Sequence, residues 1–280
     1  MKHLKTTAIV LLTVICLGTA AFFIWKIADQ AMEYKRGDDV YERMIEQAED
    51  KGDPGESPDS SGPVGSERPA DPVKSEQSDE TSGDLPSEGE DSMPDINFDS
   101  LGEISGNIRA WLYLPDTVIN YPVAQAENNS YYLYHLADGS RNANGCLFID
   151  CKNRDDFSDP NTIIYGHHMN SGKMFASLVK YADQSYYEKH PVFCLATKQG
   201  KYRLEIFSAY TTTYDSPAYT LKFATEKEHA DWLQEIREKS AIHTPVAVTE
   251  NDRIVTLSTC AYSFHNARFV VHAKLVPIDE

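Results

Sequence analysis

The first apolar run of the chain, residues 6–25, contains no charged side chain over twenty positions. A helix of that length, rising about 1.5 Å per residue, spans about 30 Å, the thickness of a bilayer's hydrocarbon core. Lys2 and Lys5 precede the run, and Trp25 ends it with a side chain suited to the membrane interface. We therefore expect residues 1–25 to form a cytoplasmic tip and an uncleaved transmembrane anchor. The alternative is a cleaved signal peptide, whose apolar region is usually shorter and is followed by a small-residue cleavage site.

Beyond the apolar run, residues 26–48 have apolar side chains at helical spacing among charges, with an interruption at Gly37. This pattern predicts a juxtamembrane helix, which we expect to be a stalk without a functional site. The pattern is lost over residues 49–95, where Pro, Gly, Ser, Asp and Glu dominate. Such a segment cannot bury enough apolar surface to fold, and we expect an acidic, disordered linker that repels itself into an extended tether.

The charge of the chain is concentrated in this linker. The formal net charge of the 280 residues is −17, and the linker alone holds 15 acidic and 3 basic side chains. The folded part is therefore much closer to neutral than the whole chain. An acidic balance of this kind argues against nucleic acid as a partner.

The remaining residues, 96–280, alternate short β-rich runs with a few helical patterns, and they are enough for one substantial core. The β-rich runs are residues 110–114, 118–123, 145–150, 162–165, 192–196, 202–210, 253–259 and 268–276. The helical patterns are residues 100–108, 129–136, 174–181 and 225–239. Many short strands separated by turn signals predict a mainly β domain, a barrel or a sandwich with peripheral helices.

The chemistry is expected where two of these strands meet. The run 253–259 ends at Cys260, and Arg268 opens the next strand, so a hairpin would bring thiol and guanidinium to the same end of a sheet. A cysteine nucleophile needs its thiolate form, which a nearby cation favours, and arginine also supplies donors for a developing oxyanion. Ser258 lies two residues before the cysteine and shares its side of the strand. Taken alone, the stretch also fits a small, buried, unreactive cysteine.

A second candidate group follows the strand 162–165, which runs through Gly166 into His167 and His168. A histidine just beyond a strand end can face a cleft and act as acid or base toward a leaving group. Adjacent residues in extended chain point in opposite directions, so only one of the two can face the site. The spacing alone does not say which one, and a structural, hydrogen-bonded histidine is the alternative.

The other cysteines give no sign of a metal or cofactor site. Cys16 lies in the apolar run, and Cys146, Cys151 and Cys194 show no C-x-x-C spacing, so a zinc site is not expected. We expect the last three to be packing residues. A disulfide among them stays open, because export would expose the domain to an oxidising environment.

Several segments, in the same order, resemble class B members of the sortase family over nearly all of residues 96–280. The segments are Trp-Leu-Tyr-Leu-Pro at 111–115, Ile-Asn-Tyr-Pro-Val at 119–123, Asn-Ser-Tyr-Tyr-Leu at 129–133, Ile-Tyr-Gly-His at 164–167, Met-Phe-Ala-Ser-Leu at 174–178, Thr-Leu-Ser-Thr-Cys at 256–260 and Arg-Phe-Val-Val at 268–271. A long helix at 225–239, before the cysteine strand, is also a class B feature.

The resemblance implies a closed eight-stranded β-barrel and a cysteine transpeptidase on the outer face of a Gram-positive cell membrane. Such an enzyme would be a single-pass protein held by residues 6–25, with its catalytic domain, residues 96–280, outside the cell. Its partners would be secreted proteins that carry a C-terminal sorting signal, cut after threonine, and the amine of a peptidoglycan precursor. Close alternatives are a pilin-polymerising sortase and a cysteine endopeptidase, and a distant one is a surface adhesion module without catalysis.

The resemblance also assigns roles residue by residue. Cys260 matches the nucleophile, His167 the acid/base, and Arg268 the group that stabilises the oxyanion and holds the signal. Substrate contacts carry over onto four further positions: Asn129, Leu133, Tyr165 and Ser258. The loop 261–267 departs from relatives, which often carry acidic residues where His265 and Asn266 stand here. That departure leaves no acidic helper residue to carry over.

Overall fold

The computed structural model describes residues 2–49, 94–261, 263 and 266–278. The linker expected over residues 49–95 therefore lies almost entirely outside the described residues, and so does His265.

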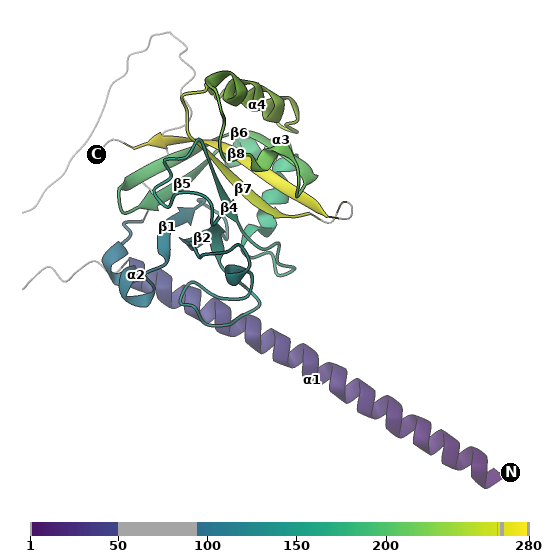
Figure 1. Cartoon of the computed structure of the whole chain (residues 1–280). Helices are drawn as coiled ribbons and strands as arrows, with labels where there is room; N and C mark the ends of the chain where they lie inside the picture. The colour runs from purple at the N-terminus through teal and green to yellow at the C-terminus, as the bar shows by residue number, and fades with distance from the viewer. Residues whose placement is uncertain (1, 50–93, 262, 264–265, 279–280) are drawn as a thin grey trace, which may run out of the picture.

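Eight strands close into a barrel in the order β1-β2-β3-β4-β7-β8-β6-β5 (Figure 1). The strands are β1 Ile108–Tyr113, β2 Asn120–Ala124, β3 Leu147–Ile149, β4 Asn161–Tyr165, β5 Val192–Thr197, β6 Gly200–Thr213, β7 Ile254–Cys260 and β8 Ala267–Pro277. Each of the eight β-rich runs became one strand with shifted ends, so the predicted mainly β barrel is confirmed.

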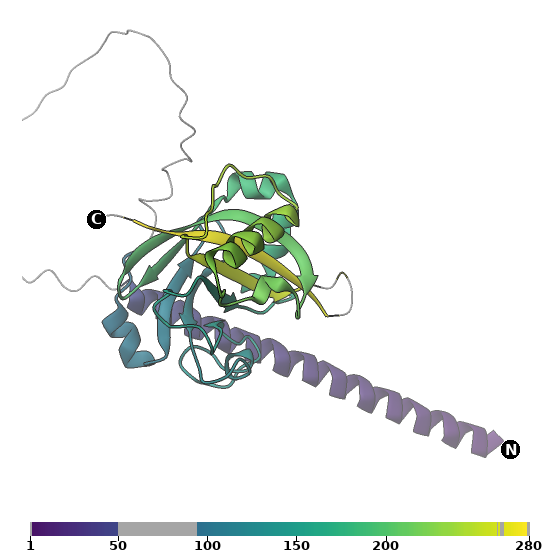
Figure 2. The same ribbon diagram turned by 45° about the horizontal axis from the view of Figure 1, so that its top comes forward.

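The barrel has two apolar layers because its central strands are buried on both sides. Along β7, alternate residues such as Val255 and Leu257 belong to the core inside the barrel, whereas Ile254 packs outside against helix α4, Glu226–Glu238. Figure 2 shows α4 lying across the outer side of the β7–β8 region. Thr225 caps this helix by accepting from the backbone N–H of Glu228, which satisfies one of the donors left free at a helix start.

The other helices show where local pattern was a poor guide. The expected helix 100–108 is α2, Phe98–Ile104, while α3, Gln184–Lys189, was not predicted. The expected helix 174–181 is a 3₁₀ segment, η3, Phe175–Ala182.

The expected helix 129–136 was wrong, because it forms only the single 3₁₀ turn η2, Tyr131–Leu133. The Asn128 side chain accepts from the backbone N–H groups of the next turn, and the carbonyl of Tyr134 accepts from Asn142 N, which turns the chain back.

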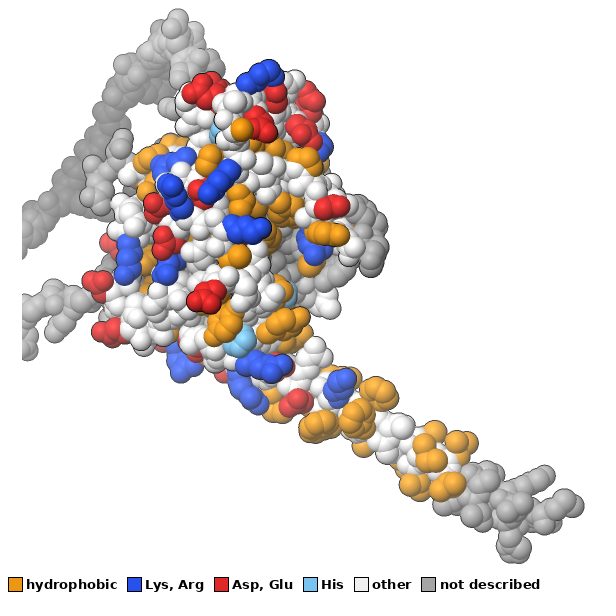
Figure 3. All heavy atoms as spheres, in the orientation of Figure 1, with side chains coloured by type: hydrophobic (Ala, Val, Ile, Leu, Met, Phe, Trp, Pro, Cys, Tyr) orange, Lys and Arg blue, Asp and Glu red, His pale blue; other side chains and the backbone are white. Residues whose placement is uncertain are grey.

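A single helix, α1, runs from Lys2 to Ala48 without a break at Gly37. Exposed apolar side chains are frequent on this helix between Leu11 and Ile27 (Figure 3), and its stretch Leu11–Ala48 contains a window long and apolar enough to cross a membrane. The later part of the helix belongs to the folded domain. Tyr41, Met44 and Ala48 are all buried in the main hydrophobic core. The segment expected to be only a stalk therefore also packs on the barrel.

Candidate active site

Cys260 and Arg268 face each other at the end of the β7–β8 hairpin. They form the last pair of the antiparallel ladder, and directly opposite residues of such a pair project to the same face. Ser258 is opposite Val270 and, two residues before the cysteine, shares that face. The hairpin expected from the sequence thus brings thiol and guanidinium together.

Strand β4 delivers the histidines to the same end of the barrel. It runs parallel to β7, with Tyr165 in register with Ser258. The register is continued past the strand by two hydrogen bonds. Gly166 N donates to Ser258 O at 3.1 Å, and Thr259 Oγ1 donates to Gly166 O at 2.9 Å. The residue after this glycine, His167, therefore lies beside the strand end that carries Cys260.

A cavity of about 370 Å³ opens at this point. All seven residues singled out from the sequence line it, although they come from four separate parts of the chain. They are Asn129, Leu133, Tyr165, His167, Ser258, Cys260 and Arg268. Cys260, His167 and Arg268 are each partly exposed, so a substrate can reach them.

The imidazole of His167 is held by the loop that precedes β3. Its Nε2 lies 2.8 Å from the carbonyl oxygen of Leu133. A carbonyl oxygen can only accept, so Nε2 carries a proton and donates it in this bond. Nδ1 is then the ring nitrogen through which a proton can be exchanged with a substrate.

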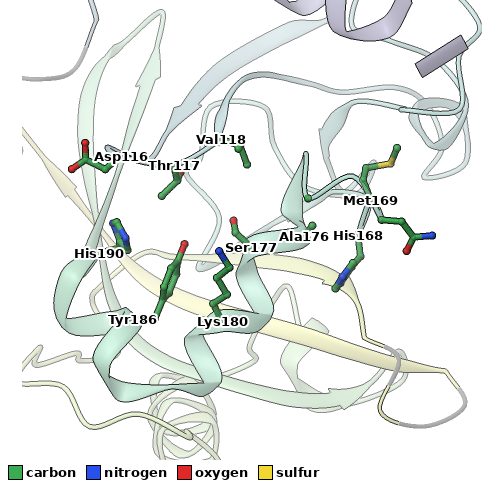
Figure 4. A pocket seen from close by; sticks show the side chains of 12 residues that line it. Asp116, Thr117, Val118, His168, Met169, Ala176, Ser177, Lys180, Tyr186 and His190 are labelled. Atoms are coloured by element: carbon green, nitrogen blue, oxygen red, sulfur yellow. The ribbon is translucent and has the colours of Figure 1, made fainter. Parts of the chain in front are cut away.

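His168 has a different environment. Its Nδ1 lies 2.9 Å from the carbonyl oxygen of Cys260 and donates to it, so it contacts the backbone of the cysteine and not the 370 Å³ cavity. It lines a second cavity of about 640 Å³, with Lys180, Tyr186 and His190 across from it (Figure 4). The tertiary structure thus separates the two adjacent histidines as the strand geometry required, and His167 is the one that shares a cavity with Cys260.

Tyr219 is a site residue that the sequence reasoning missed. It comes from the 3₁₀ turn η4, Pro217–Tyr219, and its hydroxyl lies 2.8 Å from Ser258 Oγ. Burial raises the pKa of the Tyr219 phenol, and the hydrogen bond with Ser258 and the charge of Arg268 partly offset that rise. No signal in the sequence links η4 to β7, because the contact depends on packing across about forty residues of chain.

Asp150 was also missed, although it ends a predicted strand run. This buried carboxylate accepts from Asn129 Nδ2 at 2.8 Å and from the Tyr165 hydroxyl at 3.0 Å, both through Oδ2. Burial, followed by the charge of Asp150, raises the pKa of Tyr165 well above its ordinary value, so the phenol stays a neutral donor. Asp150 therefore orients two of the residues expected to contact substrate. The signal that could have found it is an acidic residue directly after a buried apolar run.

Of the three cysteines expected to be packing residues, Cys146 and Cys194 are buried, whereas Cys151 is partly exposed like Cys260. Burial raises the pKa of the Cys146 thiol to about 12, so it stays protonated and inert. Cys194 is buried as well, and no disulfide links any two of the five cysteines, all of which the structure describes. In the described part of the chain, no cluster of three or more His, Cys, Asp or Glu side chains could hold a metal ion.

Comparison with known proteins gives consistent matches. A family model described as a sortase domain matches residues 112–276. Sortase B of Staphylococcus aureus is 40% identical over 184 residues, which cover 65% of this chain and 75% of that protein. Sortase B of Listeria monocytogenes is 38% identical over 178 residues, covering 63% and 72%. A solved S. aureus sortase B–substrate complex superposes with a TM-score of 0.62 at 40% identity, over 65% of this chain and 85% of that one.

Proposed function

The chain belongs to the sortase family, class B, and is a sortase transpeptidase; from this premise we propose that it cleaves a C-terminal sorting signal after threonine and passes the acyl group to a cell-wall amine. The proposal rests above all on one arrangement. A partly exposed thiol, an imidazole and a guanidinium line the same cavity, at the ends of strands β7, β4 and β8.

The first half of the reaction forms an acyl-enzyme. The Cys260 thiolate attacks the threonine carbonyl carbon and forms a C–S bond, and the guanidinium of Arg268 stabilises the charge that develops on the carbonyl oxygen. The C–N bond then breaks. The leaving amine takes the proton from Nδ1 of the His167 imidazolium, whose Nε2 proton stays with the carbonyl of Leu133. A thioester on Cys260 remains.

The second half transfers the acyl group. The acceptor amine attacks the thioester carbonyl, its proton passes to His167 Nδ1, and the C–S bond breaks to return the Cys260 thiolate. The charge of the resting pair is thereby restored, so each cycle conserves protons. If water took the place of the amine, the same steps would make the protein an endopeptidase.

The rest of the cavity is suited to an extended peptide. Asn129, Leu133, Tyr165 and Ser258 are proposed to contact the sorting signal, and two of them are already oriented by hydrogen bonds to Asp150. The similar S. aureus structure is itself a substrate complex, which supports a peptide in this cavity.

Helix α1 is proposed to anchor the enzyme in the cell membrane, with the barrel outside. This topology would bring the cleft close to secreted proteins and to a peptidoglycan precursor, both of which meet the enzyme at the membrane. It rests on the apolar, exposed half of α1.

The test is mass spectrometry of products formed from a library of sorting-type peptides, with and without an amine such as triglycine. We expect cleavage after threonine and, with the amine present, a ligated product. A free acid alone in both conditions would favour an endopeptidase. No cleavage by the wild type, together with no change on replacing Cys260 by alanine, would favour a surface adhesion module.

A matched pair of variants tests the choice within the histidine pair. His167→Ala is expected to abolish turnover, whereas His168→Ala, which removes a hydrogen bond to the Cys260 carbonyl, is expected to reduce it mildly. Equal losses in the two variants would contradict the proposed role of His167.

A further inference from the structure

The barrel-bound half of α1 is fastened to one loop, residues 142–146, that leads into β3. Asn142 Nδ2 donates to the carbonyl of Glu33 at 2.8 Å, and Asn144 Nδ2 donates to the carbonyl of Tyr34 at 3.1 Å. The helix approaches so closely that a Cβ on Gly37 would lie 2.4 Å from Asn144 Nδ2. The glycine that seemed to interrupt the helical pattern is therefore the point where helix and loop meet.

Tyr41 makes the deepest contact between the helix and this loop. Its side chain is 4% exposed, and its hydroxyl donates to the carbonyl of Gly145 at 2.5 Å. Its ring packs edge-on against Tyr121, with centroids 5.4 Å apart. Burial, followed by the nearby Cys146, raises the pKa of Tyr41 well above its ordinary value. The phenol is therefore a neutral, permanent donor to the Gly145 carbonyl.

Gly145 in turn lies directly against the catalytic imidazole. Its φ is +62°, a left-handed conformation that favours glycine. A Cβ built on it would lie 2.8 Å from Cδ2 and 3.1 Å from Nε2 of His167, and 2.6 Å from the carbonyl oxygen of Tyr132. The backbone of Gly145 thus forms the wall behind the same ring edge that donates to Leu133.

We propose that Tyr41 of the juxtamembrane helix is a positioning residue for His167, acting through the backbone of Gly145. The inference rests on the acid/base role proposed for His167. The His167 ring is held between the Leu133 carbonyl and the backbone of Gly145, and the hydrogen bond from Tyr41 fixes the orientation of that backbone. Because Tyr41 belongs to the same continuous helix as the apolar segment, the membrane anchor and the acid/base are mechanically connected. The helix is then part of the catalytic machinery and not only a support.

The test compares two buried tyrosines in the full-length protein, purified in detergent. Tyr41→Phe removes the hydrogen bond to Gly145 O and keeps the ring packing. Tyr181→Phe is the matched control, because Tyr181 is also fully buried and donates to a backbone carbonyl, that of His190, at 2.7 Å. Tyr181 lines neither the 370 Å³ cavity nor the Gly145 wall. Both variants are expected to lower Tm by a similar amount.

The two variants are expected to differ in kinetics. A hydrogen bond contributes a net free energy of about 1 kcal/mol, and this one is proposed to orient the His167 ring. Its loss in Tyr41→Phe is therefore expected to lower kcat by roughly fivefold, at unchanged KM. Tyr181→Phe is expected to keep the wild-type kcat per folded molecule. Equal kcat values for the two variants would overturn the inference.

A second readout is independent of any substrate. The imidazole carbon resonances of ¹³C-labelled histidines are recorded against pH, and the His167 signal is identified by its absence from His167→Ala. Tyr41→Phe is expected to move the shift and titration midpoint of this signal, and Tyr181→Phe to leave both at their wild-type values. If the wild type transferred no acyl group, the proposed function would fail, yet this titration would still decide the positioning role. An unmoved His167 signal in Tyr41→Phe refutes it.

Discussion

The outer face of the β7–β8 hairpin carries two polar cross-strand pairs, one of which is buried while the other borders a cavity. Thr256 faces His272 at the covered end, and Cys260 faces Arg268 at the open end, with the pair of Ser258 and Val270 between them. All three pairs follow the same alternation along the same two strands. What differs is the layer above them, because Trp232 of α4 packs on His272 at the first end, whereas Cys260 and Arg268 border a cavity at the second.

At the covered end the side chains of Thr256 and His272 are both hydrogen-bonded inside the protein. Thr256 Oγ1 donates to Asn161 Oδ1 at 2.7 Å and so accepts from His272 Nδ1, which lies 2.9 Å away. His272 Nε2 then accepts from the Tyr210 hydroxyl at 3.3 Å, and the Trp232 ring packs edge-on against the imidazole. Burial lowers the pKa of His272 to about 3, so this histidine stays neutral. It is a structural residue.

At the open end the same face borders a cavity, and the side chains of Cys260 and Arg268 are partly exposed. The comparison shows that residue type alone does not make a histidine or a hydroxyl on this hairpin functional. What decides a residue's environment is whether it is buried under α4, as His272 is, or borders the cavity, as Cys260 does.

The largest expected effect comes from comparing one substitution at the open end of the β7–β8 hairpin with one at its covered end. Cys260→Ala is expected to lower acyl transfer by about a thousandfold or more, because it removes the proposed nucleophile, and to leave Tm nearly unchanged. Thr256→Val at the covered end is expected to do the reverse. It leaves Asn161 and His272 without their shared partner, which costs about 1–3 kcal/mol of unfolding free energy, while activity per folded molecule is kept. Transfer assays and denaturant unfolding of both variants check this, and a Cys260→Ala protein with full activity would break the comparison.

The partner of the cysteine gives the next largest effect. Arg268→Lys keeps the positive charge and loses the planar fork of donors, so kcat/KM is expected to fall by roughly a hundredfold. Steady-state kinetics with a sorting-type peptide measures the loss. Kinetics close to the wild type would show that charge alone suffices at the open end.

The covered end predicts a pH effect on stability. His272 is neutral in the folded state, with a pKa lowered from 6.5 to about 3, whereas the unfolded chain protonates near 6.5. Stability is therefore complete above about pH 6.5 and is lost as the pH falls toward 3, with a slope of at most about 1.4 kcal/mol per pH unit from this group. Burial also lowers the pKa of His229, which adds in the same direction.

Urea unfolding between pH 7 and pH 5, above the range of most carboxyl groups, measures this slope. A His272→Gln variant serves as the control, since it cannot titrate and should show a shallower dependence. A variant slope as steep as the wild-type slope would contradict the assignment to His272.

The smallest expected effect lies at the border between the ends. Tyr219→Phe breaks the 2.8 Å hydrogen bond to Ser258 and frees the serine hydroxyl beside the cleft. We expect KM for the peptide to rise by about two- to tenfold, as loss of one neutral hydrogen bond predicts, with Tm changed little. A large loss of Tm with unchanged KM would assign Tyr219 to the covered end instead.

The strands were predictable because each is a local pattern. Runs of β-branched and aromatic residues between turn signals suffice to predict a strand, and all eight appeared. The helix expected at residues 129–136 failed because Asn128 and the return of the chain at Asn142 overrode a weak local preference. The pairing of Cys260 with Arg268 could be predicted from the sequence, because the two strands of a hairpin are close together along the chain.

The remaining site depended on contacts that no local pattern encodes. Local spacing did not distinguish His167 from His168; the family resemblance favoured His167, and the parallel register of β4 on β7 places it beside Cys260. Asp150 and Tyr219 lie at the site through packing across long stretches of chain.

By itself, then, the sequence determined the apolar segment at residues 6–25, the eight strands, and the residue types proposed to carry the chemistry, because periodicity and composition act over a few neighbouring residues. The tertiary structure alone decided which carboxylate orients Asn129 and Tyr165, and that α1 reaches the back of the His167 imidazole through Tyr41 and Gly145. These depend on barrel closure, which sets distances between residues up to a hundred positions apart, and on where the outer helices end.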